Sequence, residues 1–590
     1  MTLTFNAPRM IGARTVCTHL GLFALCLIWT FLLIAPSLFK GIDFTDQTLN
    51  YHFSLRVLDG DIPFKDFQTT VMPFSYWMEA LFHWIFGKGF WVNEVMGVVL
   101  KGVNLYLSYL ICAILVKKKF YAFSACFFMQ GVFWAGNQSP YFDFTGFAIT
   151  LSILSLYFGL KSVSHSMFSF LYGLSAALTL ITKQNFGIAL LVSFVIYLLI
   201  AFVKCKQDRS LGLKKLIFFF AGLTVVLLPF CVYFVVHGSA SDVLFILLTG
   251  SERKGISALT ALEKIHTFIP ILNLKLLLQS LISSLIILYV AGFSPLKLKR
   301  VCLAAFVVFP LVYLLSGSFA LKMILNLFIY DGVKIIICLL LLLVILLPRT
   351  TAKHRYVDFF VVTASSLIFV HELGWPGRGY SLTSISVIVL VALPFLLGNL
   401  SSSLNIRMTE MLKSSYYFGF GAFLLGASTI VSPQLSLRRD FDAESSLNLP
   451  PFYENRATSR YHHDAVMGII DIYESTCPGE KIFVFPWSPI LYTYVGAENP
   501  TRFDLPYHDW LVEAEAYELI SSLQADSPCL IVVEQSSLSS GGRETPFPAK
   551  GMRLVEVYLR GILYSNSSDY RLVREYKTFS KNHLIFKINR

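Results

Sequence analysis

Charged residues are scarce in this chain, and their scarcity decides its class. Only 14% of the 590 residues are charged, whereas 55% are hydrophobic and the mean hydropathy is +0.64. A soluble protein of this length does not need so much apolar sequence, so the composition predicts a polytopic membrane protein. The formal charge of +12 would suggest nucleic-acid binding in a soluble protein. Here the distribution of the charges along the chain gives it another meaning, as described below.

Three other features are missing. None of the ten cysteines lies in a CxxC arrangement and no histidines have HxxxH spacing, which excludes metal sites of those types. No clear internal repeat is present, which argues against a transporter built from related halves. The first apolar run, residues 17–39, has no convincing small-residue cleavage site, so we expect it to be a retained membrane anchor.

Apolar runs of spanning length predict about thirteen transmembrane helices. Basic residues concentrate in alternate loops between these runs, and acidic residues concentrate in the others. With a cytoplasmic N-terminus this pattern satisfies the positive-inside rule except at Arg253-Lys254, and it places the C-terminal region outside. The excess of basic residues therefore reflects the orientation of the chain in the membrane, and we expect no nucleic-acid partner. The runs are residues 17–39, 91–116, 120–136, 144–160, 167–182, 186–203, 216–237, 271–293, 301–319, 333–348, 356–373, 381–398 and 414–432.

The character of the chain changes after residue 432. Residues 1–432 form the predicted transmembrane domain, and residues 433–590 are polar and long enough for a core of their own. Helices alternating with short apolar strands predict a small α/β domain. Cys477 and Cys529 each precede an apolar strand, so parallel pairing allows a disulfide, although two unpaired cysteines fit equally well. The predicted helices are 464–474, 512–523 and 554–563, and the predicted strands are 482–485, 530–533, 570–576 and 583–588.

Residues 40–90 form the first outer loop, and they are rich in carboxylates. Asp43-Phe-Thr-Asp46 is followed by Gly60-Asp-Ile-Pro-Phe-Lys-Asp66-Phe, in which Gly and Pro enforce a turn, and then by Pro73. Residues 76–86 have the apolar spacing of a helix that lies along the membrane surface. Carboxylates at a membrane boundary are costly to desolvate, so these acids are either functional groups or an ordinary solvated loop.

This loop resembles the first-loop signature of GT-C glycosyltransferases. Within that superfamily it resembles bacterial members related to the protein mannosyltransferases and the lipid A aminoarabinose transferases. Gln47 stands where the family often has Glu, and Phe64 replaces the usual Tyr. Three further stretches resemble the family in order and spacing: Asn137-Gln-Ser-Pro-Tyr-Phe-Asp143-Phe, the run from Gly173 to Gly187 that contains Lys183, and the run from Ile482 to Asp504.

The resemblance implies transfer of a sugar from a polyprenyl-phosphate donor to a glycan, lipid or protein acceptor on the outer face of the membrane. It also implies a multi-pass protein of a bacterial inner membrane, with the C-terminal domain outside the cytoplasm. Asp46 is the first choice for the catalytic base and Asp43 the second. Asp143 would position the acceptor or join a metal site. Asp43 and Asp143 fit helix N-caps or solvated acids about as well.

The departing phosphate requires cationic or amide donors. We expect these from Lys183 with Gln184, from Arg378 in a Gly-rich outer turn, and from Arg253, although headgroup anchoring also explains the two arginines. Paired carboxylates can hold a divalent metal, but part of the superfamily works without one, so we predict neither metal nor other cofactor. Asp59, Asp61 and Asp66 are interpreted as turn and scaffold residues.

Two other functions remain open. A lipid or polysaccharide transporter or flippase would also be a large helical membrane protein, but it should show repeats and charged or broken segments at mid-membrane. A non-catalytic protein that binds through its outer domain is the third possibility. The identity of the sugar and the acceptor does not follow from the sequence.

Overall fold

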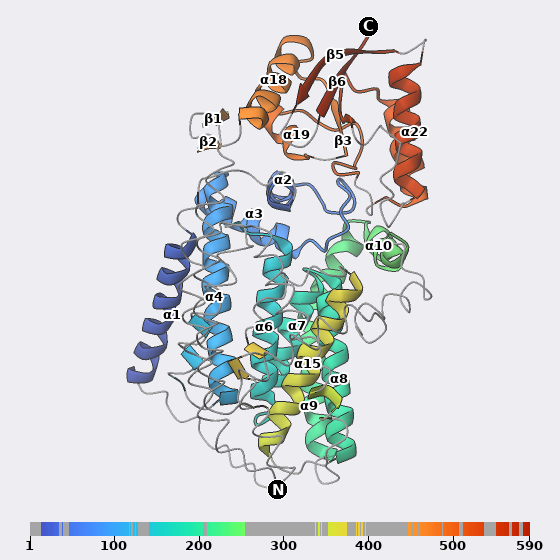
Figure 1. Cartoon of the computed structure of the whole chain (residues 1–590). Helices are drawn as coiled ribbons and strands as arrows, with labels where there is room; N and C mark the ends of the chain where they lie inside the picture. The colour runs from blue at the N-terminus through green and yellow to red at the C-terminus, as the bar shows by residue number, and fades with distance from the viewer. Residues whose placement is uncertain are drawn as a thin grey trace, which may run out of the picture.

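The computed structural model describes two regions that lie one above the other, a helical bundle and a smaller region built around a β-sheet (Figure 1). Residues 13–34 lie in the bundle, and residues 582–588 lie in the sheet. Apart from isolated positions between them, the described residues are 13–34, 46–116, 141–204, 209–253, 352–374, 446–449, 453–457, 460–486, 488–506, 511–535, 550–565, 569–577 and 582–589.

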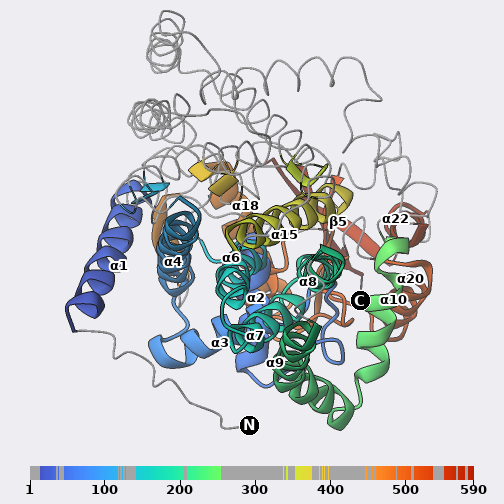
Figure 2. The ribbon, with the colours of Figure 1, turned by 90° about the horizontal axis from the view of Figure 1, so that it is seen from below.

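Seven of the described helices run side by side in the bundle, as the view along its axis shows (Figure 2). Each coincides with a predicted span, and four described helices are long and apolar enough to cross a membrane. The other six predicted spans fall wholly or largely outside the described residues, so the total of thirteen stays a prediction. The seven helices are α1 (Ala13–Ile34), α4 (Phe90–Val116), α6 (Phe144–Ser162), α7 (Phe168–Leu180), α8 (Gln184–Lys204), α9 (Arg209–Val236) and α15 (Ala352–Gly374).

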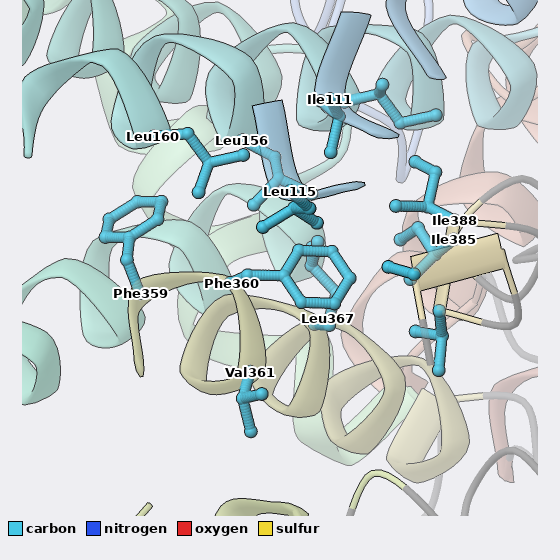
Figure 3. Packing of buried hydrophobic residues seen from close by; sticks show 14 of the residues in the cluster. Ile111, Leu115, Leu156, Leu160, Phe359, Phe360, Val361, Leu367, Ile385 and Ile388 are labelled. Carbon is cyan, nitrogen blue, oxygen red and sulfur yellow. The ribbon is translucent and has the colours of Figure 1, made fainter. Parts of the chain in front are cut away.

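Side chains from several helices interlock in the centre of the bundle. Leu115 of α4, Leu156 of α6 and Phe360 of α15 belong to one buried cluster (Figure 3). Helices α7 and α9 approach most closely where glycines replace larger residues. A Cβ on Gly173 would lie 2.1 Å from the Phe219 carbonyl oxygen, so this backbone approach requires glycine.

Two helices of the first polar loop lie between the bundle and the sheet (Figure 1). They are α2 (Asp46–Leu58) and α3 (Phe74–Phe86), and α3 confirms the helix predicted for residues 76–86. Helix α3 buries Tyr76 and Glu79 against the protein, whereas Trp84 is 73% exposed. A helix that buries polar side chains and exposes apolar ones is typical of a membrane surface, where the outer face of the helix meets lipid. A third short helix, α10 (Ala240–Arg253), follows α9 at the same end of the bundle.

The C-terminal region contains a four-stranded sheet in the order β3-β4-β6-β5. Strands β3 (Ile482–Phe485) and β4 (Leu530–Glu534) are parallel, with Ile482 opposite Leu530. Strand β6 (Asn582–Ile588) pairs antiparallel with both β4 and β5 (Tyr570–Lys577). Helices α18 (Arg460–Thr476), α19 (Ile490–Val495), α20 (Glu513–Ala525) and α22 (Lys550–Tyr564) accompany the sheet, and β1 (Ser446–Leu449) pairs with β2 (Tyr453–Ala457) as a separate two-stranded sheet.

Alternation along β3 explains why both faces of the sheet are covered. Val484 points into a cluster with residues of α18 and α19, and Phe483 into a second cluster with residues of α20 and α22. Tyr51 and Leu55 of α2 join the first cluster, so the sheet region packs directly on the first polar loop. The order of helices and strands predicted for residues 464–588 agrees with the structure except that the short helix α19 was not predicted. Residues 433–445, where the predicted domain begins, lie outside the described residues.

Cys477 and Cys529 form a disulfide with a Cα–Cα distance of 6.1 Å. The sequence left two unpaired cysteines open as an alternative. The structure has the disulfide: parallel pairing of β3 and β4 brings the segments before the two strands side by side, and the Cys529 N–H donates to the Lys481 carbonyl at 2.8 Å.

Candidate active site

One asparagine links the first polar loop to the start of α6. Helix α2 begins at Asp46, and the next residue, Gln47, donates from Nε2 to Asn93 Oδ1 of α4 at 3.4 Å. Asn93 donates from Nδ2 to the Phe142 carbonyl at 3.0 Å, and its own carbonyl accepts the Phe142 N–H at 3.1 Å. Asp46 and Asp143 therefore each adjoin a residue that is bound by Asn93.

Asp143 caps the N-terminus of α6. Its carboxylate accepts the Gly146 N–H at 2.7 Å, which confirms the N-cap interpretation of this residue. Burial raises the pKa of Asp143, although the Gly146 N–H and the nearby ammonium groups of Lys183 and Lys101 oppose that rise. A carboxylate with a raised pKa is a better proton acceptor, so capping does not exclude a chemical role.

Lys183 stands at the corner between α7 and α8. Its Nζ donates to Thr145 Oγ1 at 2.7 Å and lies 5.1 Å from the ring centre of Phe144 and 5.5 Å from that of Phe186. These contacts bring the ammonium group to the N-terminal turn of α6. The N-termini of α6 and α8 meet here, and their partial positive charge favours an anion.

The loop rests on this corner. Gln184 donates from Nε2 to the Thr70 carbonyl at 3.3 Å, and the Phe74 N–H donates to the Ile181 carbonyl at 3.1 Å. The structure therefore brings the start of α2, Asp143, Lys183 and Gln184 to one end of the bundle, beneath the C-terminal sheet.

The remaining predicted site residues have no described side chains. Arg253 is the last residue of α10. Asp43 and Arg378 lie outside the described residues, as do the side chains of Asp46 and Arg253. Among the side chains that are described, no group of three or more His, Cys, Asp or Glu has the arrangement of a metal site. The absence of a metal in the proposed reaction stays a prediction.

The other loop acids hold the loop together, as expected of scaffold residues. Asp61 pairs with Arg56 at 2.6 Å, and Asp59 pairs with Lys88 at 2.6 Å. Asp66 accepts the Ile62 N–H at 2.8 Å and closes the turn.

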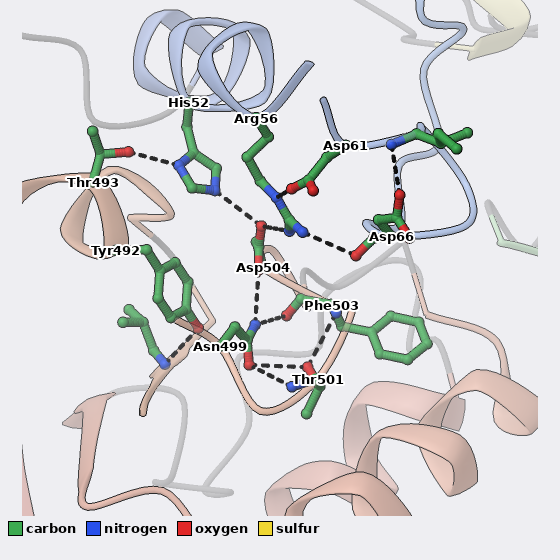
Figure 4. A network of polar contacts seen from close by, with 12 residues as sticks. His52, Arg56, Asp61, Asp66, Tyr492, Thr493, Asn499, Thr501, Phe503 and Asp504 are labelled. Atoms are coloured by element: carbon green, nitrogen blue, oxygen red, sulfur yellow. Dashed lines mark hydrogen bonds and ion pairs between the residues drawn. The ribbon is translucent and has the colours of Figure 1, made fainter. Parts of the chain in front are cut away.

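Asp504, from the C-terminal region, is inserted into this loop (Figure 4). Its carboxylate accepts hydrogen bonds from Arg56 at 2.6 Å, His52 at 2.9 Å and Asn499 at 2.9 Å, and the residue is 2% exposed. Burial alone would raise the pKa of Asp504, but the Arg56 guanidinium and the hydrogen bonds from His52 and Asn499 hold it well below its usual range. Thr493 completes the network through the other ring nitrogen of His52, at 2.8 Å.

A second set of contacts between the C-terminal region and the loop lies beside the Asp504 network. Arg502 donates to the Phe64 carbonyl at 2.7 Å and pairs with Asp242 of α10 at 3.2 Å, while both its Nε and Nη2 bind Glu518. Phe64 has a positive φ of 70°, which is uncommon for a bulky residue and indicates a strained turn held by its surroundings. These contacts fix the loop from above while the bundle supports it from below.

The sequence did not identify several of these residues as parts of the site. His52, Asn93 and Glu79 carried no motif, and Asp504 appeared only within a stretch that resembles the family. The one available signal for Glu79 was a single carboxylate within an otherwise apolar surface helix.

A scan against protein-family models and a search of curated proteins each find no match. Solved structures are similar to the chain over nearly its whole length. The crystal structure of ArnT from Cupriavidus metallidurans bound to undecaprenyl phosphate has 12% identity and a TM-score of 0.44, covering 97% of this chain and 98% of that one. The apo structure of ArnT from the same organism has 11% identity and a TM-score of 0.45, covering 98% and 99%.

Proposed function

We propose that this membrane protein transfers a sugar from a polyprenyl-phosphate donor to an acceptor on the outer face of the membrane. The main support for the proposal is that the start of α2, the Asp143 segment and Lys183 come together around Asn93 and the α7–α8 corner. The start of α2, where Asp46 lies, and the N-cap Asp143 are joined through Asn93, and Lys183 contacts the first turn of α6. A proton acceptor and a cationic phosphate site are the two elements that such a transfer requires.

In the proposed reaction, Asp46 removes the proton from the acceptor's hydroxyl, amine or amide group as that group attacks the anomeric carbon. The bond between the anomeric carbon and the phosphate oxygen breaks, and polyprenyl phosphate departs with the electron pair. Lys183 and the N-termini of α6 and α8 favour the negative charge that develops on this phosphate. Asp143 orients the acceptor, and Asp43 is the alternative base.

The further donor-phosphate ligands in this proposal are Gln184, Arg253 and Arg378. Gln184 is the best supported of the three, because it adjoins Lys183 and begins α8. The proposal needs no metal and leaves the acceptor as a glycan, lipid or protein. It places the protein in a bacterial inner membrane with the sheet region outside the cytoplasm.

Replacing Asp46 by Asn tests the proposal, with Asp59→Asn as the matched control. Both residues are carboxylates of the first polar loop, but Asp59 is occupied in a surface pair with Lys88. Purified protein in lipid nanodiscs would be given a panel of polyprenyl-phosphate sugars with envelope extracts as acceptors. We expect Asp46→Asn to abolish transfer and Asp59→Asn to retain it.

Unchanged transfer by Asp46→Asn would reject the base assignment. Absence of transfer by the wild-type protein with every donor would reject the enzymatic function. Movement of intact lipid or glycan across proteoliposomes would then favour the transporter.

A further inference from the structure

Glu79 is a fully buried carboxylate that the proposed reaction does not use. It lies on α3 with 0% exposure, on the face opposite the exposed Trp84. Both oxygens accept hydrogen bonds: Oε1 from Asn93 Nδ2 at 2.6 Å, and Oε2 from Ser54 at 2.9 Å and from Asn50. Glu79 therefore joins α3 to both α2 and α4.

His83, one turn later on α3, lies beside this carboxylate. Its Nδ1 lies 3.1 Å from the Gly87 carbonyl, which can only accept, so Nδ1 carries a proton. Its Nε2 lies 3.4 Å from Glu79 Oε1. A buried carboxylate without such a partner would be strongly destabilising.

The carboxylate also determines which way the Asn93 amide faces. Glu79 Oε1 and the Phe142 carbonyl both accept from Asn93 Nδ2, so the amino group of Asn93 points toward them and Oδ1 points the other way. That orientation is the one that lets Oδ1 accept from Gln47 while Nδ2 also binds the Phe142 carbonyl. With the Asn93 amide reversed, its amino group would face the amino group of Gln47, and its oxygen would face the Phe142 carbonyl oxygen.

We propose that Glu79 is a positioning residue, which acts through Asn93 to hold the start of α2 and the Asp143 segment in a fixed relation. The proposal extends the proposed function, because the two segments that it aligns carry the proposed base and the acceptor-orienting carboxylate. In this proposal Glu79 acts through its bonds to Asn93, Asn50 and Ser54 and takes no part in proton transfer.

The variant Glu79→Gln tests this role with little change of shape. One accepting oxygen becomes an amino group, which opposes the donors Asn93, Asn50 or Ser54. The matched control is Glu515→Gln, because Glu515 is also a buried carboxylate that holds the loop, through Gln68 at 2.5 Å. We expect hydrogen–deuterium exchange to rise in peptides covering 46–50 and 141–147 in Glu79→Gln, and to stay unchanged there in Glu515→Gln.

Kinetics give the second readout. Glu79→Gln should lower kcat roughly 10- to 100-fold, the range for losing a hydrogen bond to a charged group, with the donor KM unchanged. The double variant Glu79→Gln/Asn93→Ala should be no slower than Asn93→Ala, because both changes remove the same alignment. If Glu79→Gln does not fold, Asn93→Ala alone should still raise exchange in both segments.

Additive losses in the double variant, or unchanged exchange in both segments, would overturn the positioning role. A rise in exchange that is equal in Glu515→Gln would also overturn it, since the effect would then be general loosening of the loop. If the wild-type protein transfers no sugar, the proposed function fails, and the exchange measurements still decide whether Glu79 aligns the two segments.

Discussion

Arg56 and Asp504 are 448 residues apart in the sequence, yet Nη1 of the first lies 2.6 Å from Oδ2 of the second. Arg56 also binds Asp61, and its guanidinium lies 5.0 Å from the ring centre of Phe67, so it joins three parts of the site at once. The sheet region is therefore part of the structure that shapes the first polar loop.

Asp504→Asn should weaken this attachment. Removing one partner of a buried ion pair leaves the other charge poorly compensated, and such changes cost about 3–5 kcal/mol. The melting temperature of the protein in detergent should fall clearly, as followed by tryptophan fluorescence. Asp526→Asn is the control, because its pair with Lys481 is half exposed and should contribute less than about 1 kcal/mol. Equal melting temperatures for the two variants would contradict the assignment of Asp504 as a main anchor.

The same carboxylate predicts how stability depends on pH. The pKa of Asp504 in the folded protein lies below that of an unfolded aspartate, about 3.9. Its contribution is therefore fully present above about pH 4 and is lost as the pH falls further toward the folded value. Melting curves of wild type and Asp504→Asn should differ at neutral pH and converge as the pH drops below 4. A difference that grows with acidification would reject this account.

Local pattern predicted the seven described bundle helices and the four strands of the larger sheet, but not α2, α10 or α19. Contact between distant segments accounts for the site residues that were missed. Strand 482–485 and the helix at 91–116 follow from runs of apolar residues whose length suits one kind of element. The Arg56–Asp504 pair has no local signature, because nothing in either neighbourhood specifies a partner hundreds of residues away. Glu79 was missed for a related reason: its proposed positioning role depends on contact with Asn93, which belongs to a different helix.

The disulfide should contribute to the stability of the sheet region. Cys477 and Cys529 are separated by 52 residues, and closing a loop of that size typically stabilises by about 2–4 kcal/mol. Replacing both by Ser should speed proteolysis after α18, whereas Cys231→Ser, at an exposed free cysteine, should not. Intact-mass measurement before and after reduction checks the bond itself. Identical masses would contradict its presence.

The close approach of α7 and α9 predicts the effect of adding a single methyl group. In Gly173→Ala the new Cβ would collide with backbone atoms of Phe219, and overpacking of this kind costs about 1–3 kcal/mol. Gly212→Ala is the control, because no atom lies within 4 Å of its added Cβ. We expect a lower melting temperature for the first variant and an unchanged or higher one for the second. The reverse order would contradict the packing.

Lys183→Gln should weaken binding of the lipid phosphate more than it weakens the fold. Gln can still bond to Thr145, so the corner keeps a polar contact, but the positive charge beside the N-termini of α6 and α8 is lost. A lost charged hydrogen bond predicts roughly 10- to 100-fold weaker binding. Native mass spectrometry with a polyprenyl phosphate, the leaving group of the proposed transfer, measures this directly. Lys88→Gln, which removes a surface lysine paired with Asp59, should bind like wild type. Equal binding of the lipid phosphate by both variants would show that the phosphate site does not include Lys183.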